Sequence, residues 1–106
     1  MMDISSYLQD NKLTVFLKGE LISQCIKEVI TTITNEIEKT TPKICQLDFK
    51  DVSFMDESGI AVVINILRQM TGLNGTLSVC GVCKQPMNVF RASGVAALVH
   101  IEPLEK

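Results

Sequence analysis

The sequence has few aromatic residues and no tryptophan, and it lacks both a long hydrophobic run and a cluster of basic residues. Four Phe and one Tyr provide no evident stacking platform for bases, and a net charge of −2 provides no cationic surface for a phosphate backbone. The longest apolar run outside loops, from Ile60 to Ile64, is far too short to cross a bilayer. We therefore expect no nucleic-acid partner and no direct insertion into a membrane.

The N-terminal segment and the cysteines indicate the compartment. Residues 1–12 lack the basic start and the apolar stretch of a signal peptide. The expected location is therefore cytoplasmic, where the four cysteines should stay reduced. The chain has 106 residues, of which 46% are hydrophobic and 21% charged, and this is enough for a single domain with a hydrophobic core.

Hydrophobic periodicity predicts an opening hairpin followed by alternating helices and strands. The predicted strands cover residues 4–8, 13–17, 44–49, 76–82 and 97–101. The predicted helices cover residues 22–37, ending before Thr41, and residues 58–70 and 85–93, with Gly94 as the left-handed cap of the last. Right-handed crossovers then give an α/β fold, with a mixed, mostly parallel sheet of about five strands and helices mainly on one face.

Residues 54–59, FMDESG, lie where a predicted strand ends and a predicted helix begins, which is where functional groups gather in such folds. In one interpretation Ser58 is a helix cap, whose hydroxyl accepts a bond from an amide of the first turn. Asp56 and Glu57 would then favour the positive end of the helix dipole. The only histidine, His100, is not placed by the sequence to activate Ser58, so a serine hydrolase is poorly supported.

A second interpretation of Ser58 comes from the spacing of the helix that follows it. The predicted core face consists of Ile60, Val63, Ile64, Leu67 and Met70. The opposite stripe consists of Ser58, Val62, Asn65 and Gln69, flanked by Ala61 and Ile66. This stripe carries no charge, so it is predicted to dock a partner protein unless the chain itself covers it. A phosphate on Ser58 would add ~1.5 to 2 negative charges at its edge and prevent docking, and the helix amides would accommodate the phosphate.

Cys80 and Cys83 form a C-x-x-C pair before a predicted helix, a spacing typical of redox sites. The pair lies at a late strand-to-helix junction, has no preceding Trp and is followed by Pro86, which favours a purely structural role. Cys25 and Cys45 supply no second close pair, so no metal site is expected. No cofactor is expected, since the methionines show no cofactor-like spacing, and the carboxylates form no recognisable acid/base pair.

Three stretches resemble the STAS domain family, which includes bacterial anti-sigma factor antagonists and the cytosolic domains of sulfate transporters. Residues 17–21, LKGEL, resemble the family's strand that ends in G-E-L, and residues 93–95 resemble the S-G-L that closes its third helix. Residues 47–60 resemble its signature, which usually ends in D-S-S-G-L or D-S-T-G-L. Glu57 stands in place of the first hydroxyl residue of that signature. The resemblance implies one STAS domain over residues 1–106.

The resemblance also implies a function in a partner-switching pathway. In the antagonists, the hydroxyl residue before the signature glycine is phosphorylated by an anti-sigma factor that is itself a serine kinase of the GHKL type. Ser58 matches that position. The unphosphorylated antagonist binds the kinase and frees the sigma factor, and the phosphorylated form is released until a phosphatase restores it. ATP and Mg²⁺ belong to the kinase, so the chain is expected to be no enzyme and to need no cofactor.

The residues expected to bind the partner come from the signature loop, the neutral stripe and the G-E-L stretch. They are Asp56, Glu57, Ser58, Gly59, Val62, Asn65, Gln69 and Glu20. Glu20 otherwise marks only the loop before the first helix. The alternative function is a STAS subunit that regulates a membrane transport complex, a lipid ABC transporter or a sulfate-transporter-like system, through the same surface and without phosphorylation. A redox role of Cys80 and Cys83 is the remaining enzymatic alternative.

Overall fold

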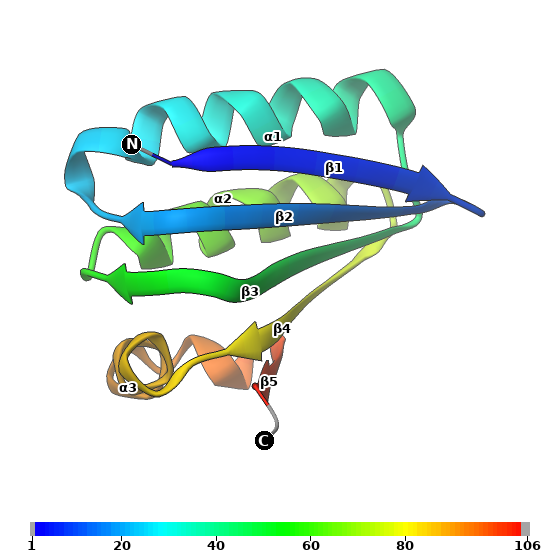
Figure 1. Cartoon of the computed structure of the whole chain (residues 1–106). Coiled ribbons are helices and arrows are strands. Elements are labelled where there is room, and N and C mark those ends of the chain that lie inside the picture. Colours follow the sequence, from blue (N-terminus) through cyan, green and yellow to red (C-terminus); the bar gives the residue numbers. More distant parts are fainter. Residues whose placement is uncertain (1, 105–106) are drawn as a thin grey trace.

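The computed structural model describes residues 2–104, which form a five-stranded sheet, three α-helices and two short 3₁₀ segments (Figure 1). The elements in chain order are β1 (Asp3–Gln9), β2 (Lys12–Leu21), η1 (Ser23–Cys25), α1 (Ile26–Thr40), β3 (Ile44–Met55), α2 (Gly59–Gly72), β4 (Thr76–Val82), α3 (Lys84–Ser93), η2 (Val95–Ala97) and β5 (His100–Pro103). The strands are neighbours in chain order, with β1 antiparallel to β2 and all later pairs parallel. The predicted α/β class and mostly parallel sheet are confirmed.

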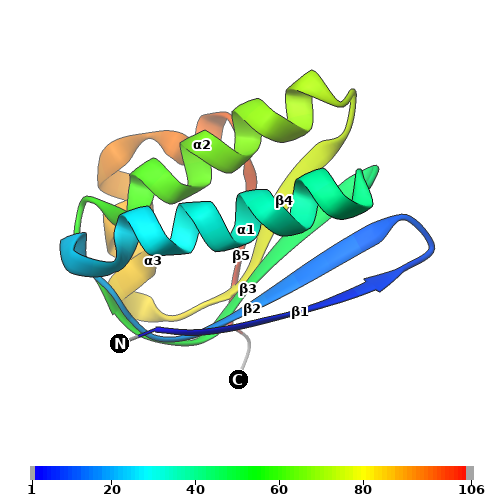
Figure 2. The same ribbon diagram turned by 90° about the horizontal axis from the view of Figure 1, so that it is seen from above.

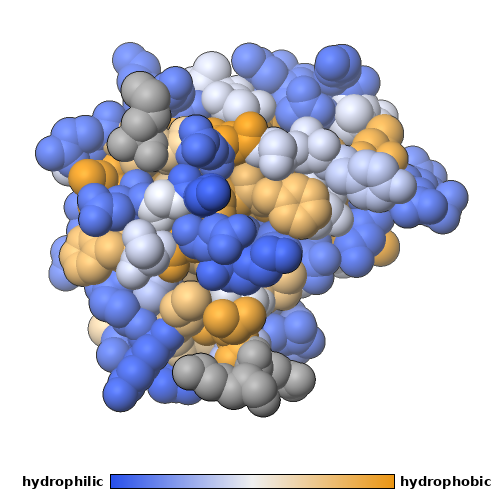
Figure 3. Space-filling model, viewed as in Figure 1, coloured by the Kyte–Doolittle hydropathy of each residue, from blue (hydrophilic) through white to orange (hydrophobic). Residues whose placement is uncertain are grey.

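The helices α1 and α2 cover one face of the sheet, as the view along its edge shows (Figure 2). Alternate residues of β2 and β3 point into the space between the layers, and Val15, Leu47 and Phe49 are among the most buried side chains there. The opposite face of the sheet has a mostly hydrophilic surface with scattered apolar side chains (Figure 3). Within residues 2–104, no helix is long and apolar enough to cross a membrane.

Most predicted element boundaries hold, and the differences have local causes. The turn of the opening hairpin uses Asp10 (φ 53°) and Asn11 (φ 65°), the left-handed pair that matches strand twist in a two-residue loop. The strands β2 and β3 run further than predicted, to Leu21 and Met55, because irregularities in their pairing carry the ladder past the polar residues. The last strand begins later than predicted, because η2 follows the left-handed Gly94.

The predicted core face of α2 is wrong by roughly a quarter turn. The fully buried residues are Gly59, Val62, Val63, Ile66 and Met70. Ile60, Ile64 and Leu67 are only half-buried, while Ala61 and Arg68 are exposed. This helix is apolar around most of its circumference, so spacing alone does not fix its rotation. Val62 and Ile66 therefore belong to the core and cannot form a docking stripe.

Candidate functional site

The turn between β3 and α2 holds Asp56, Glu57 and Ser58 at the carboxyl edge of the sheet. Three backbone hydrogen bonds begin the helix within this turn: Gly59 N donates to Asp56 O (3.0 Å), Ile60 N to Glu57 O (3.1 Å) and Ala61 N to Ser58 O (3.0 Å). Ser58 itself already has helical dihedral angles, with φ −67° and ψ −19°. Its side chain is half-buried and Glu57 is exposed.

The Ser58 hydroxyl does not cap α2, so the capping interpretation is wrong. The hydroxyl instead donates a hydrogen bond to Asp56 Oδ1, which also accepts one from the Ser58 amide (3.0 Å). The physical reason is that Ser58 has helical dihedral angles, whereas a residue whose side chain caps a helix is typically extended. Asp56 performs the capping role, and Ser58 Oγ is held beside a carboxylate.

Asp56 also ties the site to the neighbouring strand. Its Oδ2 accepts a hydrogen bond from Ser23 N (3.1 Å), and its own amide donates to Leu21 O (3.2 Å). The hydrogen bond from the Ser58 hydroxyl, and then those from the Ser23 and Ser58 amides, lower the pKa of Asp56 against the opposing effect of desolvation. The carboxylate is therefore charged at neutral pH and fixes the turns after β2 and β3 to each other.

Gly59 allows α2 to start directly against the end of β3. A Cβ at this position would lie 2.5 Å from Met55 Cγ, 2.7 Å from Met55 Sδ and 3.2 Å from Leu21 Cδ2. Met55 and Leu21 are both fully buried, so neither side chain can move into solvent. The glycine is thus required by close packing, and it positions Ser58 where the core and the surface meet.

Gln85, in the first turn of α3, contacts the site from the other side and was not predicted. Its Oε1 accepts a hydrogen bond from Met55 N (2.8 Å), and its Nε2 donates to Met55 O (2.9 Å). The pairing of β3 with β4 ends at Asp48 and Cys80, so the end of β3 has no strand neighbour on that side. The side-chain amide replaces that neighbour. No sequence signal connects two residues that lie 30 positions apart.

The α2–α3 hollow, a surface cavity of about 470 Å³, lies beside the turn. It is lined by Glu57, Ile60, Asn88, Val89, Ala92 and Ser93. Glu57 supplies its acidic rim, and the half-buried Ile60 and Val89 supply apolar surface. This hollow begins at Glu57, next to Ser58 in the sequence, and none of its lining residues belongs to the predicted stripe.

Among the other predicted binding residues, the structure covers Val62, Asn65 and Gln69 fully or in part and leaves Glu20 exposed. Asn65 and Gln69 are half-buried, and Gln69 Nε2 donates to Asn65 Oδ1 (2.8 Å) and to Thr34 Oγ1 (2.7 Å), which ties α2 to α1. Val62 is fully buried. Glu20 is exposed and in register with Phe54, so it lies near the same edge of the sheet. The chain's own α1 therefore covers one flank of the predicted stripe.

The four cysteines are free thiols. Burial raises the pKa of Cys45 to about 12. Burial, and then the nearby Asp48 and Glu102 carboxylates, also raise the pKa of Cys80, which disfavours the thiolate that redox exchange needs. Within residues 2–104, no group of three or more His, Cys, Asp or Glu is placed to hold a metal ion.

A family model described as the STAS domain matches residues 3–106. The chain belongs to the STAS domain family. The fold of this STAS domain resembles that of the Bacillus cell fate determinant SpoIIAA, at 20% identity. The unphosphorylated form of SpoIIAA, described as an anti-sigma factor antagonist, gives a TM-score of 0.80 over 93% of this chain and 87% of that chain. Its phosphorylated form gives a TM-score of 0.69 over 93% and 90%.

Two further solved structures show the range of proteins that share this fold. An anti-sigma factor antagonist from Mycobacterium paratuberculosis has a TM-score of 0.86 and 14% identity, over 97% of this chain and 86% of that chain. A sulfate transporter family protein from Wolinella succinogenes has a TM-score of 0.74 and 14% identity, over 91% and 80%. At such identities the likeness establishes the fold, and the predicted family resemblance is confirmed.

Proposed function

We propose that this STAS domain is an anti-sigma factor antagonist that works by partner switching. With Ser58 unmodified it binds an anti-sigma factor serine kinase of the GHKL type, and phosphorylation of Ser58 by that kinase releases it. A cognate phosphatase resets the cycle. The observation that supports this most directly is the position of the Ser58 hydroxyl, half-buried at the start of α2 beside Asp56 and next to the α2–α3 hollow.

Phosphorylation would change the charge of this surface while leaving the core unchanged. A phosphate adds ~1.5 to 2 negative charges, here beside the Asp56 carboxylate and the exposed Glu57. The modified oxygen has no proton, so its hydrogen bond to Asp56 is lost. The Ser58 side chain caps no helix amide and lies outside the core, so the fold survives this loss. A partner that fits closely against the unmodified Ser58 hydroxyl then meets a bulky, hydrated dianion and dissociates.

The α2–α3 hollow would supply the permanent part of the contact. Its apolar surface at Ile60 and Val89 accepts a hydrophobic side chain of the partner, and Glu57 at its rim favours a basic residue beside that side chain. A phosphate on Ser58 would also attract that basic residue, so release would come from the size and hydration of the phosphate, which would hold the apolar surfaces of the hollow and of the partner apart.

The test begins with purification of the protein from its native cells together with its bound partner. A GHKL-type kinase should co-purify, and incubation with ATP should place one phosphate on Ser58, mapped by mass spectrometry. Ser58→Ala should stay bound in the presence of ATP, and Ser58→Asp should bind weakly. Ser53→Ala is the matched control, because Ser53 is exposed on β3 and its hydroxyl only donates to Gly19 O (3.4 Å).

Two results would overturn this proposal. Absence of phosphate from Ser58 after incubation with the bound kinase and ATP would reject the switch. Co-purification of a transporter ATPase subunit in place of a kinase would support regulation of a membrane transport complex. In that case phosphorylation plays no part, so Ser58→Ala and Ser58→Asp should differ in affinity only through the one negative charge that aspartate adds.

A further inference from the structure

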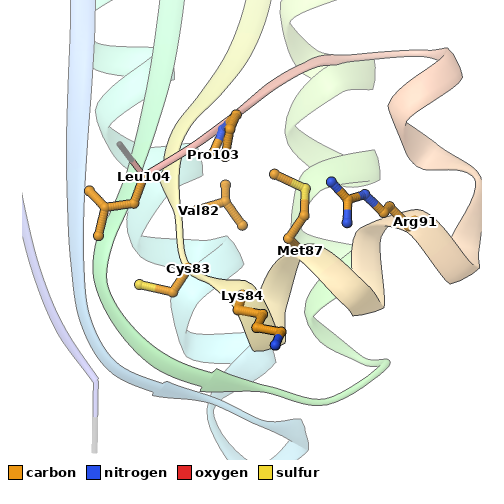
Figure 4. Close-up of a pocket in the computed structure, with 7 residues that line it drawn as sticks. All are labelled: Val82, Cys83, Lys84, Met87, Arg91, Pro103 and Leu104. Carbon is orange, nitrogen blue, oxygen red and sulfur yellow. The ribbon is translucent and has the colours of Figure 1, made fainter. Parts of the chain in front are cut away.

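The helix α3 borders a second cavity on its other side, between the face that carries Lys84, Met87 and Arg91 and the end of β5. This α3–β5 hollow has a volume of about 390 Å³. Figure 4 shows Val82 and Met87 around it, with Pro103 and Leu104 of the last segment and with Lys84 and Arg91 from α3. Among its lining residues, only Cys83 is a candidate site residue from the sequence, for redox chemistry.

The floor of the α3–β5 hollow is apolar. Val82 and Met87 are almost fully buried, at 2% and 8% exposure, so only their edges reach the cavity. Leu104 is 42% exposed and adds a hydrophobic wall to it. Apolar surface that stays open in this way gains free energy when a hydrophobic group fills it. The hollow therefore favours an apolar ligand group.

The rim of the α3–β5 hollow is cationic. Lys84 and Arg91 are exposed and seven residues apart, which places them on the same face of α3 roughly 10 Å from each other along the axis. Within residues 2–104 the one ion pair is His100–Glu102, so neither cation is neutralised by a described carboxylate. In a chain with a net charge of −2, two cations that have no ion-pair partner among the described residues favour an anion beside this apolar cavity.

The two hollows lie on opposite faces of α3. Asn88, Val89, Ala92 and Ser93 face the α2–α3 hollow, whereas Lys84, Met87 and Arg91 face the α3–β5 hollow. At 100° per residue these two sets are centred about 135° apart on the helix. A ligand in the α3–β5 hollow therefore leaves the surface around Ser58 free.

We propose that the α3–β5 hollow binds a small amphiphilic anion, an acyl chain that ends in a carboxylate or phosphate. The chain occupies the space over Val82 and Met87, and the anionic group lies between Lys84 and Arg91. The volume falls within the range of small-molecule sites, about 300–1,000 Å³. A stable protein partner would instead need about 800 Å² of contact surface, which a cavity of this size does not supply.

The test is a titration of the isotope-labelled protein with decanoate, decyl phosphate and the neutral decanol, followed by amide chemical shifts below the micellar concentration. Both anions should bind saturably, with the largest amide shifts at Val82, Lys84, Met87, Arg91 and Leu104. The double variant Lys84→Gln/Arg91→Gln should weaken binding of the anions roughly 3- to 20-fold, to the level of decanol. Lys39→Gln is the matched control, since Lys39 is an exposed cation in the last turn of α1. The tighter of the two anions identifies the preferred head group.

A second measurement uses the cysteine at the edge of the hollow. Cys83 lines the cavity and Cys25 lies in η1, and both are half-buried free thiols. Bound decanoate should slow alkylation of Cys83 by iodoacetamide and leave Cys25 unchanged. Equal binding of decanol and decanoate, unchanged affinity in the double variant, or shifts centred on the α2–α3 hollow would each overturn the proposal.

Discussion

Substitution of Gly59 by alanine tests whether α2 starts against β3 because no side chain intervenes. The added Cβ would lie 2.5 Å from Met55 Cγ, well inside van der Waals contact, and Met55 is fully buried. Overpacking of this kind costs about 1–3 kcal/mol, because buried neighbours must leave their preferred rotamers. Alanine recovers up to about 1 kcal/mol through its higher helix propensity. The middle of these two ranges gives a loss of about 1–2 kcal/mol in the free energy of unfolding for Gly59→Ala.

The same substitution at the other end of α2 provides the control. A Cβ on Gly72 would have no atom within 4 Å, so Gly72→Ala should be neutral or should stabilise the domain by up to about 1 kcal/mol. Urea denaturation followed by circular dichroism gives both values, and the slopes should match that of the unmodified protein. In thermal melts each kcal/mol corresponds to about 4–8 °C. If Gly59→Ala is as stable as the unmodified protein, the close-packing argument is wrong and Ser58 is positioned by other contacts.

Three further predictions concern the hydrogen bonds and thiols described above. Gln85→Ala leaves Met55 N–H and C=O without their partner, so it should cost about 1–3 kcal/mol for each group in urea denaturation, whereas the exposed Asn88→Ala should cost little. Asp56 has a lowered pKa, so its contribution to stability is present above the pKa of the unfolded carboxyl, about 4, and is lost as the pH falls through the folded value. Asp56→Asn should not show that loss. Urea midpoints of the unmodified protein and of Asp56→Asn, measured across acidic pH, test this, and parallel curves for the two proteins would contradict it. Cys45 has a pKa of about 12, so iodoacetamide at about pH 8 should alkylate it only as fast as the domain unfolds; rapid alkylation of the native protein, detected by mass spectrometry, would refute its burial.

The sequence predicted the fold well because the fold depends on periodicity. The strand β4 was predicted to the residue, and Gly94 was identified as the left-handed end of α3. The ends of β2 and β3 were not predictable, because bulges allow a strand to continue through polar positions. The rotation of α2 was not predictable either, because a helix that is apolar on several sides can turn its core face in more than one direction.

The geometry of the candidate site was predicted in part, for a related reason. The position of Ser58 at a strand-to-helix junction follows from local pattern, and so does the presence of Asp56 beside it. The hydrogen bond between them was not predicted, because it depends on the dihedral angles of Ser58 itself. Gln85 and Ser23 were missed, since they reach the turn only through the packing of α3 and of the turn after β2.

The Gln85 amide has a consequence for how this surface can change during evolution. One side chain fixes the start of α3 to the backbone of Met55, and α3 forms a wall of both hollows. A substitution at Gln85 would therefore disturb two surfaces at once. We expect Gln85 to be more strongly conserved than other half-buried residues. The remaining outward positions of the helix can vary independently, and each face can acquire a new specificity without displacing the other.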